Sequence, residues 1–504
     1  MNETELKLAV DDGFELPVLE PAATGVAAVR EHPPADLRAT YFDTADLRLA
    51  RNGITLRHRT GEDERNGWTL KLPLDGANGQ GAAVREEHFF PGGSTGPPPE
   101  AVNLVTAYVR DSSLGPVAKI QTQRRSWILT DENGGELAEL AADEVSVLDK
   151  RRKVVLFREL ELEARTLDRD GLDRIAGELT KAGAAFSDPT PKLVRVLGQQ
   201  AAAPPDLVQI SAPGPEDPAG EAVRSALVAG TARLVANDPG TRLGQVEPLH
   251  QMRVALRRLR SDIRTFAPLI EKGWAKDVIP ELRWLGRALG AVRDQDVLLE
   301  RLKASADGLE ADLAPLFETL EASRRDKHGE LLDALSSNRY RRLVDSLTGA
   351  APAPPLTEAA DRPCSEALPP LAQKAWEKLA KKVKATPPTA PAEDLHEVRI
   401  HVKRARYAAE AVGPSLRGKK AKRARRFAAR AAALQDVLGA NQDTVVARRA
   451  IAQAAGLRPE DTAFGIAATS LFKRQQELAI EYRYRYPKAW TKLNRPKRTK
   501  WMCV

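Results

Sequence analysis

The sequence contains little cysteine and no long apolar run. Its two cysteines, Cys364 and Cys503, stand far apart and lack the spacing of metal ligands. This argues against a disulfide framework and a zinc site, and it favours a reduced, cytoplasmic compartment. No apolar stretch reaches roughly 18 residues, and the N-terminus lacks a basic region followed by an apolar core. We therefore expect neither a membrane span nor a signal peptide.

Aromatic residues are also scarce, at 5% of the chain. Their scarcity in the second half argues against stacking of nucleic-acid bases on protein rings there. The first half offers only Tyr41 and Trp68 as obvious ring-stacking candidates among its expected strands. No Ser, Cys or His motif typical of a catalytic nucleophile stands out. The sequence thus gives little sign of base recognition or covalent catalysis.

Charge divides the chain into two parts. Residues 1–200 contain 25 Lys+Arg and 33 Asp+Glu, a net charge of −8. The totals of 77 and 69 leave 52 and 36 for residues 201–504, a net charge of +16. An acidic part and a strongly basic part imply different partners, and 504 residues are too many for one ordinary core. We expect two or three domains.

The local pattern predicts an α+β multidomain protein. In residues 1–200, short runs bounded by turn residues predict strands and two helices. The strands are expected at 40–44, 54–59, 68–72, 84–90 and 119–129, and the helices near 22–31 and 171–184. Residues 201–218 are rich in Ala, Pro and Gly and predict a linker. Beyond it, residues 219–500 read as an all-α domain of amphipathic helices.

Carboxylates alternate along two of the strand-like segments. They stand at Glu159, Glu161 and Glu163 and, near the N-terminus, at Glu3 and Glu5 beside Lys7. Period two places the charges on one face of a strand, and leucines fill the other face. Like charges about 7 Å apart repel by about 2 kcal/mol at an effective dielectric of ~20. Something cationic must face them, which favours a metal-lined cavity.

Cations in the same half match these carboxylates. They are Lys7, Arg57, Arg59, Lys71, Lys119, Arg125 and Lys192. Carboxylates bind a hard divalent ion, and Lys and Arg neutralise phosphate groups. The ordinary alternative is the solvent face of an antiparallel sheet, where alternating charge is normal. Strand alternation points only one of Arg124 and Arg125 inward, and Arg125 is preferred because it shares the parity of Lys119.

The motifs of this half resemble the CYTH domain, the triphosphate tunnel metalloenzymes. The chain contains, in family order, Glu3-x-Glu5-x-Lys7, Tyr41-Phe-Asp-Thr44, Leu49-x4-Ile54-Thr-Leu-Arg57-x-Arg59, Trp68-Thr-Leu-Lys71 and Glu159-Leu-Glu-Leu-Glu163. The resemblance covers residues 1–200. It implies an eight-stranded antiparallel β-barrel whose polar tunnel binds a triphosphate with Mg²⁺ or Mn²⁺.

The resemblance also implies roles for single residues. The implied metal ligands are Glu3, Glu5, Glu161 and Glu163, with Glu159 and Asp143 as further candidates and Glu144 as a neighbour of Asp143. The implied catalytic cations, which hold the phosphates, are Lys7, Arg57, Arg59, Lys71, Arg125 and Lys192. A metal-activated water would attack a terminal phosphorus. The preferred substrate is inorganic triphosphate; thiamine triphosphate, nucleoside triphosphates and adenylate cyclisation stay open.

Two basic stripes repeat in the second half. The first consists of His250, Arg253, Arg257, Arg260 and Arg264, with Arg258 beside it; the second consists of His396, Arg399, Lys403 and Arg406, with Arg404 beside it. Steps of three and four residues place each stripe on one helix face. A constant offset of 146 relates the two, and a Leu-Gly-Ala block repeats at an offset of 149. Two copies of one module are indicated, at about 219–348 and 365–485.

These stripes resemble the CHAD domain over about residues 219–500. The resemblance implies two four-helix bundles related by pseudo-twofold symmetry, whose basic surface binds inorganic polyphosphate through the stripe residues. A solvated helix face is the ordinary alternative. Nucleic acid, held through its phosphates alone, is the less favoured partner. The leading hypothesis is a cytoplasmic metal-dependent triphosphatase with a polyphosphate-binding helical domain, and its rival is a non-catalytic polyanion-binding scaffold.

Overall fold

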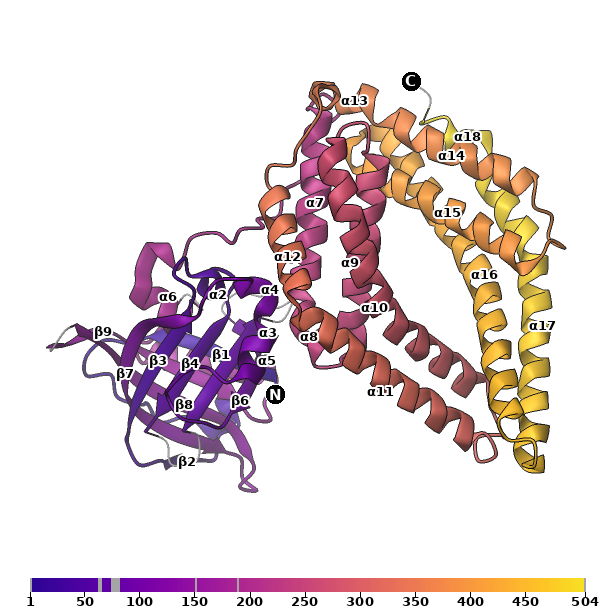
Figure 1. The fold of residues 1–504 in the computed structure, drawn as a ribbon. Helices are drawn as coiled ribbons and strands as arrows, with labels where there is room; N and C mark the ends of the chain where they lie inside the picture. Colours follow the sequence, from indigo (N-terminus) through magenta and orange to yellow (C-terminus); the bar gives the residue numbers. More distant parts are fainter. Residues whose placement is uncertain (1, 62–65, 74–81, 150–151, 188–189, 503–504) are drawn as a thin grey trace. The chain divides into compact units, whose positions relative to one another are not determined.

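The computed structural model describes residues 2–61, 66–73, 82–149, 152–187 and 190–502. The chain divides into two compact units, residues 1–205 and 206–504. Figure 1 shows strands in the first unit and helices in the second. The change of composition near residue 200 therefore coincides with a change of secondary structure.

An antiparallel sheet builds the first unit. Among the described residues, eight strands close into a barrel in the order β1-β6-β5-β4-β3-β7-β8-β9, because β9 pairs back onto β1. They are β1 (Asn2–Ala9), β3 (Ala35–Asp43), β4 (Thr55–Thr60), β5 (Gly67–Pro73), β6 (Ala82–Phe90), β7 (Gly115–Thr130), β8 (Glu136–Asp149) and β9 (Arg152–Ala164). Two short strands extend the sheet: β2 (Ala28–Glu31) pairs with β7, and β10 (Ala185–Phe186) with β1. The predicted eight-stranded barrel is confirmed.

Alternation along β1 and β9 separates an apolar face from a charged one. Leu6, Leu8, Leu160 and Leu162 are buried in a core that also includes the apolar side of α5 (Arg169–Lys181). Burial of each leucine side chain stabilises the folded state by roughly 1.5–3 kcal/mol. The intervening carboxylates and Lys7 consequently point to the barrel interior, as Glu5, Lys7 and Glu161 show by lining its cavity.

The first unit departs from the predicted helices in one place. The predicted helix at 171–184 is present as α5. Asp168 caps its N-terminus, because the Asp168 side chain accepts a hydrogen bond from the Gly171 amide. The predicted helix at 22–31 is wrong. Only α1 (Pro21–Thr24) forms there, and it ends at Gly25 with φ 79°. The residues beyond it form β2 because they pair with β7.

The remaining helices of the first unit are short. They are α2 (Arg48–Arg51), α3 (Pro99–Leu104), α4 (Thr106–Val109) and α6 (Lys192–Leu197). Of these, α6 matters for the site, because it delivers Lys192 to the barrel interior from outside the sheet. Lys192 was expected among the strand cations and instead stands at the first position of a helix.

The second unit is all-helical and consists of two bundles. The first is built from α7 (Ala219–Ala236), α9 (Val246–Thr265), α10 (Lys272–Ser305) and α11 (Ala314–Ser336), and the second from α14 (Pro369–Lys384), α15 (Ala392–Val412), α16 (Gly418–Gly456) and α17 (Thr462–Leu493). The shorter helices are α8 (Asp238–Arg242), between α7 and α9; α12 (Asn338–Ala350) and α13 (Cys364–Ala367), between the two bundles in the chain; and α18 (Pro496–Thr499), after α17. The two predicted four-helix bundles are confirmed. None of the helices in the described ranges is long and apolar enough to cross a membrane.

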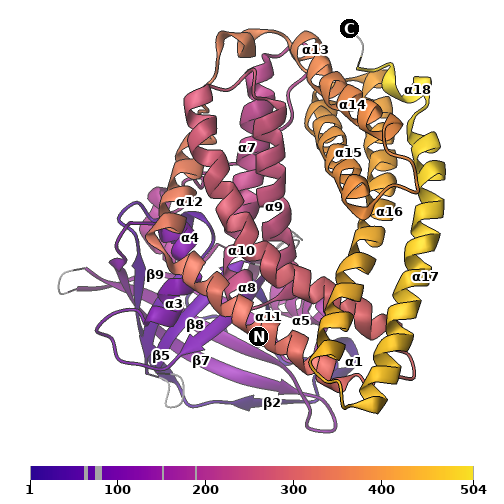
Figure 2. The same cartoon turned by 45° about the vertical axis from the view of Figure 1, so that its right-hand side comes forward.

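The two bundles meet through equivalent helices. The 146-residue repeat places its two copies on α9 and α15, which contact one another, and the Leu-Gly-Ala blocks lie on α10 and α16. Figure 2 shows α16 and α17 side by side, as their contacts require. Leu302 and Leu316 of the first bundle share a core with Ile451 and Phe464 of the second. This core joins the two copies within one unit.

Candidate functional site

The barrel interior holds a cavity of about 600 Å³. Its charged lining comes from seven of the barrel strands, from Arg165 directly after β9, and from α6. The charged residues are Glu5, Lys7, Arg57, Arg59, Lys71, Arg85, Glu87, Arg124, Glu139, Glu161, Glu163, Arg165 and Lys192. Both signs of charge therefore share one cavity. Such a lining suits an anion that arrives with a metal ion.

Three carboxylates in the barrel form a compact cluster. Asp143 of β8 pairs across the sheet with Glu159 of β9, and Glu161 follows two residues later on the same face. One oxygen from each of the three lies within 4.8 Å of the others. Carboxylate oxygens are the donors that hard ions such as Mg²⁺ and Mn²⁺ prefer. The donor set therefore fits a divalent metal.

Cations neutralise this cluster in the structure. The Lys7 ammonium lies 2.7 Å from Glu161, and Lys192 lies 3.0 Å from the same carboxylate and also contacts Asp143. Arg124 donates two hydrogen bonds to Asp143, at 2.8 and 2.6 Å, and a third to Glu161 at 2.7 Å. Each of these acids and bases is largely buried, so the pairs are screened little by water.

Burial and charge act in opposite directions on these groups. Burial alone would lower the pKa of Lys7, but Glu161, Glu5 and Glu159 outweigh it and hold that pKa above its ordinary value. Burial would likewise raise the pKa of Glu161, yet Lys192, Lys7 and Arg124 keep it well below the usual range. Glu161 is therefore ionised and Lys7 charged, which is the state that a metal and a phosphate require.

Glu159 is the most enclosed member of the cluster, with a fully buried side chain. One of its oxygens accepts a hydrogen bond from Arg195 of α6 at 2.6 Å. Its other oxygen accepts no hydrogen bond from the described residues and lies 3.3 Å from the Lys192 ammonium. A buried carboxylate oxygen without a hydrogen bond is costly unless another ligand approaches it, which again fits a metal.

The structure brings most of the predicted residues to the cavity. Lys7, Arg57, Arg59, Lys71, Lys192, Glu5, Glu161 and Glu163 line it. Asp143 and Glu159 do not line it themselves, but both contact Lys192, which does. Glu3 pairs with Arg85 across β1 and β6; the structure describes its backbone but not its side chain. Glu144, the alternative to Asp143, instead pairs with Arg158 at 2.9 Å.

The choice of Arg125 over Arg124 is wrong. The Arg125 side chain is 62% exposed and pairs with Glu31 of β2 at 2.9 Å, whereas Arg124 lines the cavity. Lys119, whose parity guided the choice, is itself exposed. The two residues do share a face, but that face is the outer one. Parity relates residues to one another without saying which face is inside.

Sequence reasoning missed several residues of the cavity. Glu87 of β6 lies opposite Lys71 of β5, and their charged groups are 3.0 Å apart. Arg85 and Glu87 have the alternation of a tunnel-facing strand, so this signal was present in the sequence. Arg195 had no such signal. It follows Lys192 by three residues on α6, and its guanidinium lies 3.5 Å above the Phe157 ring.

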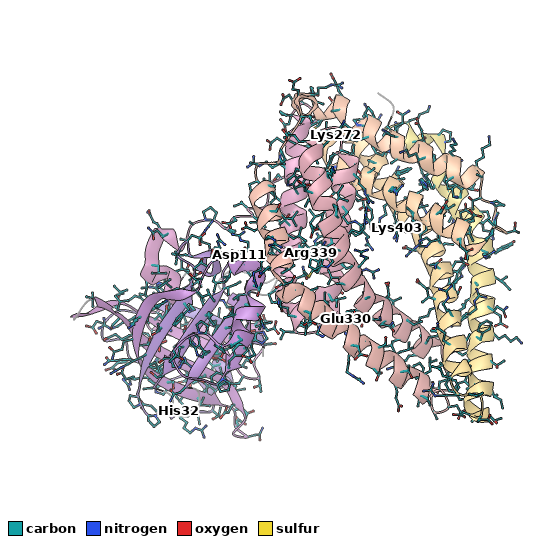
Figure 3. All side chains as sticks on the ribbon, viewed as in Figure 1. His32, Asp111, Lys272, Glu330, Arg339 and Lys403 are labelled. Carbon is teal, nitrogen blue, oxygen red and sulfur yellow. The ribbon has the colours of Figure 1, made fainter. Side chains whose placement is uncertain are left out.

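In the helical unit, four stripe residues influence one another strongly. The pKa of Lys403 on α15, labelled in Figure 3, falls to about 7. Burial is the largest cause, followed by the charges of Arg399, Arg257 and Arg253, while Asp443 acts in the other direction. The two stripes therefore meet across the contact of α9 and α15. Cations held this close favour a polyanion that relieves their repulsion.

The two histidines flank this group. Burial and the charge of Arg293 lower the pKa of His250, and burial with the charges of Arg399 and Lys403 lowers that of His396. Both side chains are half-buried. The Nδ1 atom of His396 is buried and has no hydrogen-bond partner in the described part of the chain. Both histidines are therefore uncharged at neutral pH and can donate or accept hydrogen bonds.

The other stripe residues have different surroundings. Arg258 and Arg406 both donate to Glu410, at 2.7 and 2.8 Å; the bond from Arg258 joins α9 to α15, and the bond from Arg406 lies within α15. Arg260 faces Arg283, whose charge adds to burial in lowering its pKa. Arg264 and Arg404 line a separate pocket beside α14. The residues expected to act as one polyphosphate surface thus divide into four groups: the set around Lys403, the two arginines on Glu410, Arg260 beside Arg283, and the pair at the separate pocket.

Comparison with known proteins identifies both units. A CYTH domain model matches residues 1–195, and a CHAD domain model matches residues 225–452. The uncharacterized protein Rv2226 of Mycobacterium tuberculosis is 34% identical over 531 residues, which span 98% of this chain and 96% of the relative. The chain therefore belongs to the family of proteins that join a CYTH domain to a CHAD domain.

Two solved structures are similar to part of the chain. PptA from Streptomyces chartreusis is 25% identical with a TM-score of 0.47, covering 54% of this chain and 99% of that one. The CHAD domain from the plant Ricinus communis is 26% identical with a TM-score of 0.47, covering 58% of this chain and 96% of that one.

Proposed function

We propose that the barrel is a metal-dependent triphosphatase that hydrolyses a small triphosphate to phosphate and pyrophosphate. One observation carries the proposal: the carboxylate cluster and a set of arginines and lysines adjoin the same cavity of about 600 Å³. Hydrolysis of a phosphoric anhydride depends on position and charge more than on covalent chemistry. Mixed charge in one cavity supplies both requirements.

The acidic side of the cavity would hold the metal. The proposed ligands are Glu3, Glu5, Asp143, Glu159, Glu161 and Glu163. When bound, Mg²⁺ or Mn²⁺ supplies Lewis-acid charge and lowers the pKa of a bound water. The residues of the chain orient the triphosphate so that its terminal phosphorus faces the carboxylates. Lys7 and Lys192, now held by those carboxylates, are within reach of the incoming phosphates.

The basic side of the cavity would hold the phosphates. Arg57 and Arg59 project from β4 and Lys71 from β5, the strand that pairs with it. One guanidinium group binds two phosphate oxygens at once through two N–H donors, and the Lys71 ammonium adds a point charge. Arg124 takes the place that the sequence suggested for Arg125. These groups stabilise negative charge on the equatorial oxygens as the terminal bond breaks.

Inorganic triphosphate is the preferred substrate. Trp68 is buried in the apolar core, where its indole donates to the Gly93 carbonyl, so it offers no face to a base. Tyr41 lines the cavity, but its hydroxyl accepts a hydrogen bond from Arg57 at 3.4 Å. A lining of this kind recognises phosphates and has little with which to read a base or sugar. Thiamine and nucleoside triphosphates, and adenylate cyclisation, are the alternatives.

We propose further that the helical unit binds inorganic polyphosphate at the basic surface formed by His250, Arg253, Arg257, His396, Arg399 and Lys403. The mutual influence of its cations supports this, because a flexible polyanion relieves their repulsion. Nucleic acid is the less favoured ligand, since exposed aromatic rings are few. We place the protein in the cytoplasm, in keeping with its free Cys364 thiol.

The enzymatic proposal is tested by Glu5→Gln and Glu161→Gln, which remove carboxylate charge with little change of shape. Both variants should lose phosphate release, and both should still bind polyphosphate. Unchanged phosphate release would contradict the assigned metal ligands. If the wild-type protein releases no phosphate from any triphosphate but binds polyphosphate, the non-catalytic scaffold is the better account.

The binding proposal is tested by Arg257→Glu and Lys403→Glu. Each should weaken polyphosphate binding and flatten its dependence on salt, because fewer counterions are then released. Glu144→Lys, a charge reversal on the barrel, is the control and should leave polyphosphate binding unchanged. Equally tight binding of duplex DNA at physiological salt would contradict the proposed preference for polyphosphate.

A further inference from the structure

Because of the internal repeat, each contact between α9 and α15 has an equivalent contact between the corresponding residues of the other copy. Both helices are unbroken, so the offset of 146 carries Arg258 onto Arg404 and carries Glu410 back onto Arg264. The pseudo-twofold relation of the bundles therefore makes the contact of Arg258 with Glu410 equivalent to that of Arg404 with Arg264. One member of this pair of contacts is an ion pair and the other joins two cations.

The ion pair is well neutralised. Arg258 donates to Glu410 at 2.7 Å and lies 3.6 Å from the Asp262 carboxylate. At the related position, Arg264 replaces Glu410 and Ala408 replaces Asp262. Two carboxylates that compensate Arg258 thus have no counterpart beside Arg404. The two copies of the repeat therefore differ in charge at these related positions.

A pocket of about 310 Å³ occupies the position without carboxylates. Arg264 and Arg404 line it, together with Lys374 and Lys378 of α14 and His401 of α15. No acidic residue is among the described residues of its lining. Leu371, Pro268 and Ala375 form an apolar part of the wall, and the lining shares no residue with the proposed polyphosphate surface.

Two further observations indicate that positive charge predominates around the pocket, although Glu397 lies close enough to His401 to oppose the lowering of the His401 pKa. The Nδ1 atom of His401 is buried and makes no hydrogen bond within the described part of the chain. Burial, followed by the charges of Arg260 and Arg404, lowers the pKa of Arg264. An anion placed between the two arginines would satisfy the histidine and remove their repulsion.

We propose that this pocket binds the phosphate group of a small phosphorylated compound between Arg264 and Arg404, with Lys374, Lys378 and His401 around it. The bound phosphate takes the part that Glu410 and Asp262 play at the related position. The phosphate belongs either to a free molecule of the size of pyrophosphate or to the end of a polyphosphate chain. The site does not depend on the activity proposed for the barrel.

The test uses the full chain with inorganic pyrophosphate in EDTA, read by hydrogen exchange so that binding is located along the sequence. Pyrophosphate should slow exchange at 261–268, 371–378 and 401–404 in the wild type. Arg264→Glu places a carboxylate where the other copy of the repeat has Glu410. This variant should lose the protection, and its melting temperature should rise because the new carboxylate pairs with Arg404. Lys276→Glu, the same charge change on the exposed surface of α10, should keep it.

Arg264→Gln serves as a second variant and should weaken pyrophosphate binding at the pocket about tenfold. A parallel experiment with short-chain polyphosphate separates the two sources. If only polyphosphate protects the pocket, and Arg264→Glu abolishes that protection, the bound phosphate is the end of a polyphosphate chain. If both pyrophosphate and polyphosphate protect the pocket, the bound phosphate belongs to a free phosphate compound. Undiminished protection in Arg264→Glu, or none at the pocket with either ligand in the wild type, overturns the proposal.

Discussion

Arg399 of α15 lies directly against Gly439 of α16. A Cβ atom built on Gly439 would stand 3.3 Å from the Nε and Nη2 atoms of Arg399. The repeat places Arg253 against Gly290 of α10 in the same way, with a closest approach of 3.8 Å. Both glycines are buried in their helices, and both leave space for an arginine of the basic surface. The fit is tighter in the second bundle.

This difference predicts opposite behaviour for two matched variants. Gly439→Ala should displace Arg399 and weaken polyphosphate binding several-fold, although alanine stabilises a helix by up to about 1 kcal/mol relative to glycine. Gly290→Ala should bring the same helical gain and leave binding unchanged. Calorimetric titration and thermal unfolding measure the two effects. Equal binding by both variants would show that Arg399 makes no contact with the polymer.

The lowered pKa of Lys403 predicts proton uptake on binding. Its pKa of about 7 in the folded protein lies below the ordinary value of 10.5. Between these values the folded state binds fewer protons than the unfolded state, so the free energy of unfolding should rise with pH in that window. A polyanion restores the ordinary pKa. Binding at pH 8 should therefore take up protons, measured by titration in buffers with different heats of ionisation.

Lys403→Arg is the control for this prediction. Arginine keeps a positive charge at every working pH and does not titrate in this range. The variant should bind polyphosphate at pH 8 with little proton uptake. The same uptake in the wild type and the variant would assign the titration to another group, such as His396, and would contradict the account of Lys403.

Arg124 and Arg125 provide a matched pair in the barrel. Arg124→Gln removes a cation that touches Asp143 and Glu161, and we expect kcat/KM for the triphosphate to fall about 100-fold. Arg125→Gln changes an exposed residue on the outer face and should alter the rate less than about twofold. Steady-state phosphate release measures both. A larger loss in the Arg125 variant would contradict the observed orientation of β7.

Alternation along the strands made much of this site predictable. Glu159, Glu161 and Glu163 alternate with leucines, so the sequence alone indicates a strand with one charged and one apolar face. For a strand judged from its own sequence, such as β7, the pattern does not reveal which face points into the barrel. Arg125 was placed on the wrong face for that reason. Lys192 was found by resemblance, but its position on α6 follows from tertiary packing that no local pattern encodes.

The helical unit was predictable at the level of its repeat. The offset of 146 predicts two related helices, and α9 and α15 are those helices. It does not predict that Arg258 of α9 pairs with Glu410 of α15, because ion pairs between helices depend on their packing. Helix periodicity places residues on a face without naming the residues opposite.

Glu410 accordingly has a structural role that can be measured. Glu410→Gln removes the carboxylate that Arg258 and Arg406 share, and we expect the free energy of unfolding to fall by about 1–2 kcal/mol, since these groups are partly exposed. Glu366→Gln, which breaks an exposed pair with Arg362, should change it by less than about 0.5 kcal/mol. Chemical denaturation measures both. Equal small changes would show that the α9–α15 contact does not depend on this pair.

The most direct test of the account is phosphate release by the purified protein with Mg²⁺ or Mn²⁺. Inorganic triphosphate, ATP, thiamine triphosphate and long-chain polyphosphate are compared, each with an EDTA control. We predict rapid, metal-dependent release from inorganic triphosphate, its loss in Glu161→Gln, and slower release from the other three. No release from any of the four substrates would contradict the central claim that the barrel is a triphosphatase.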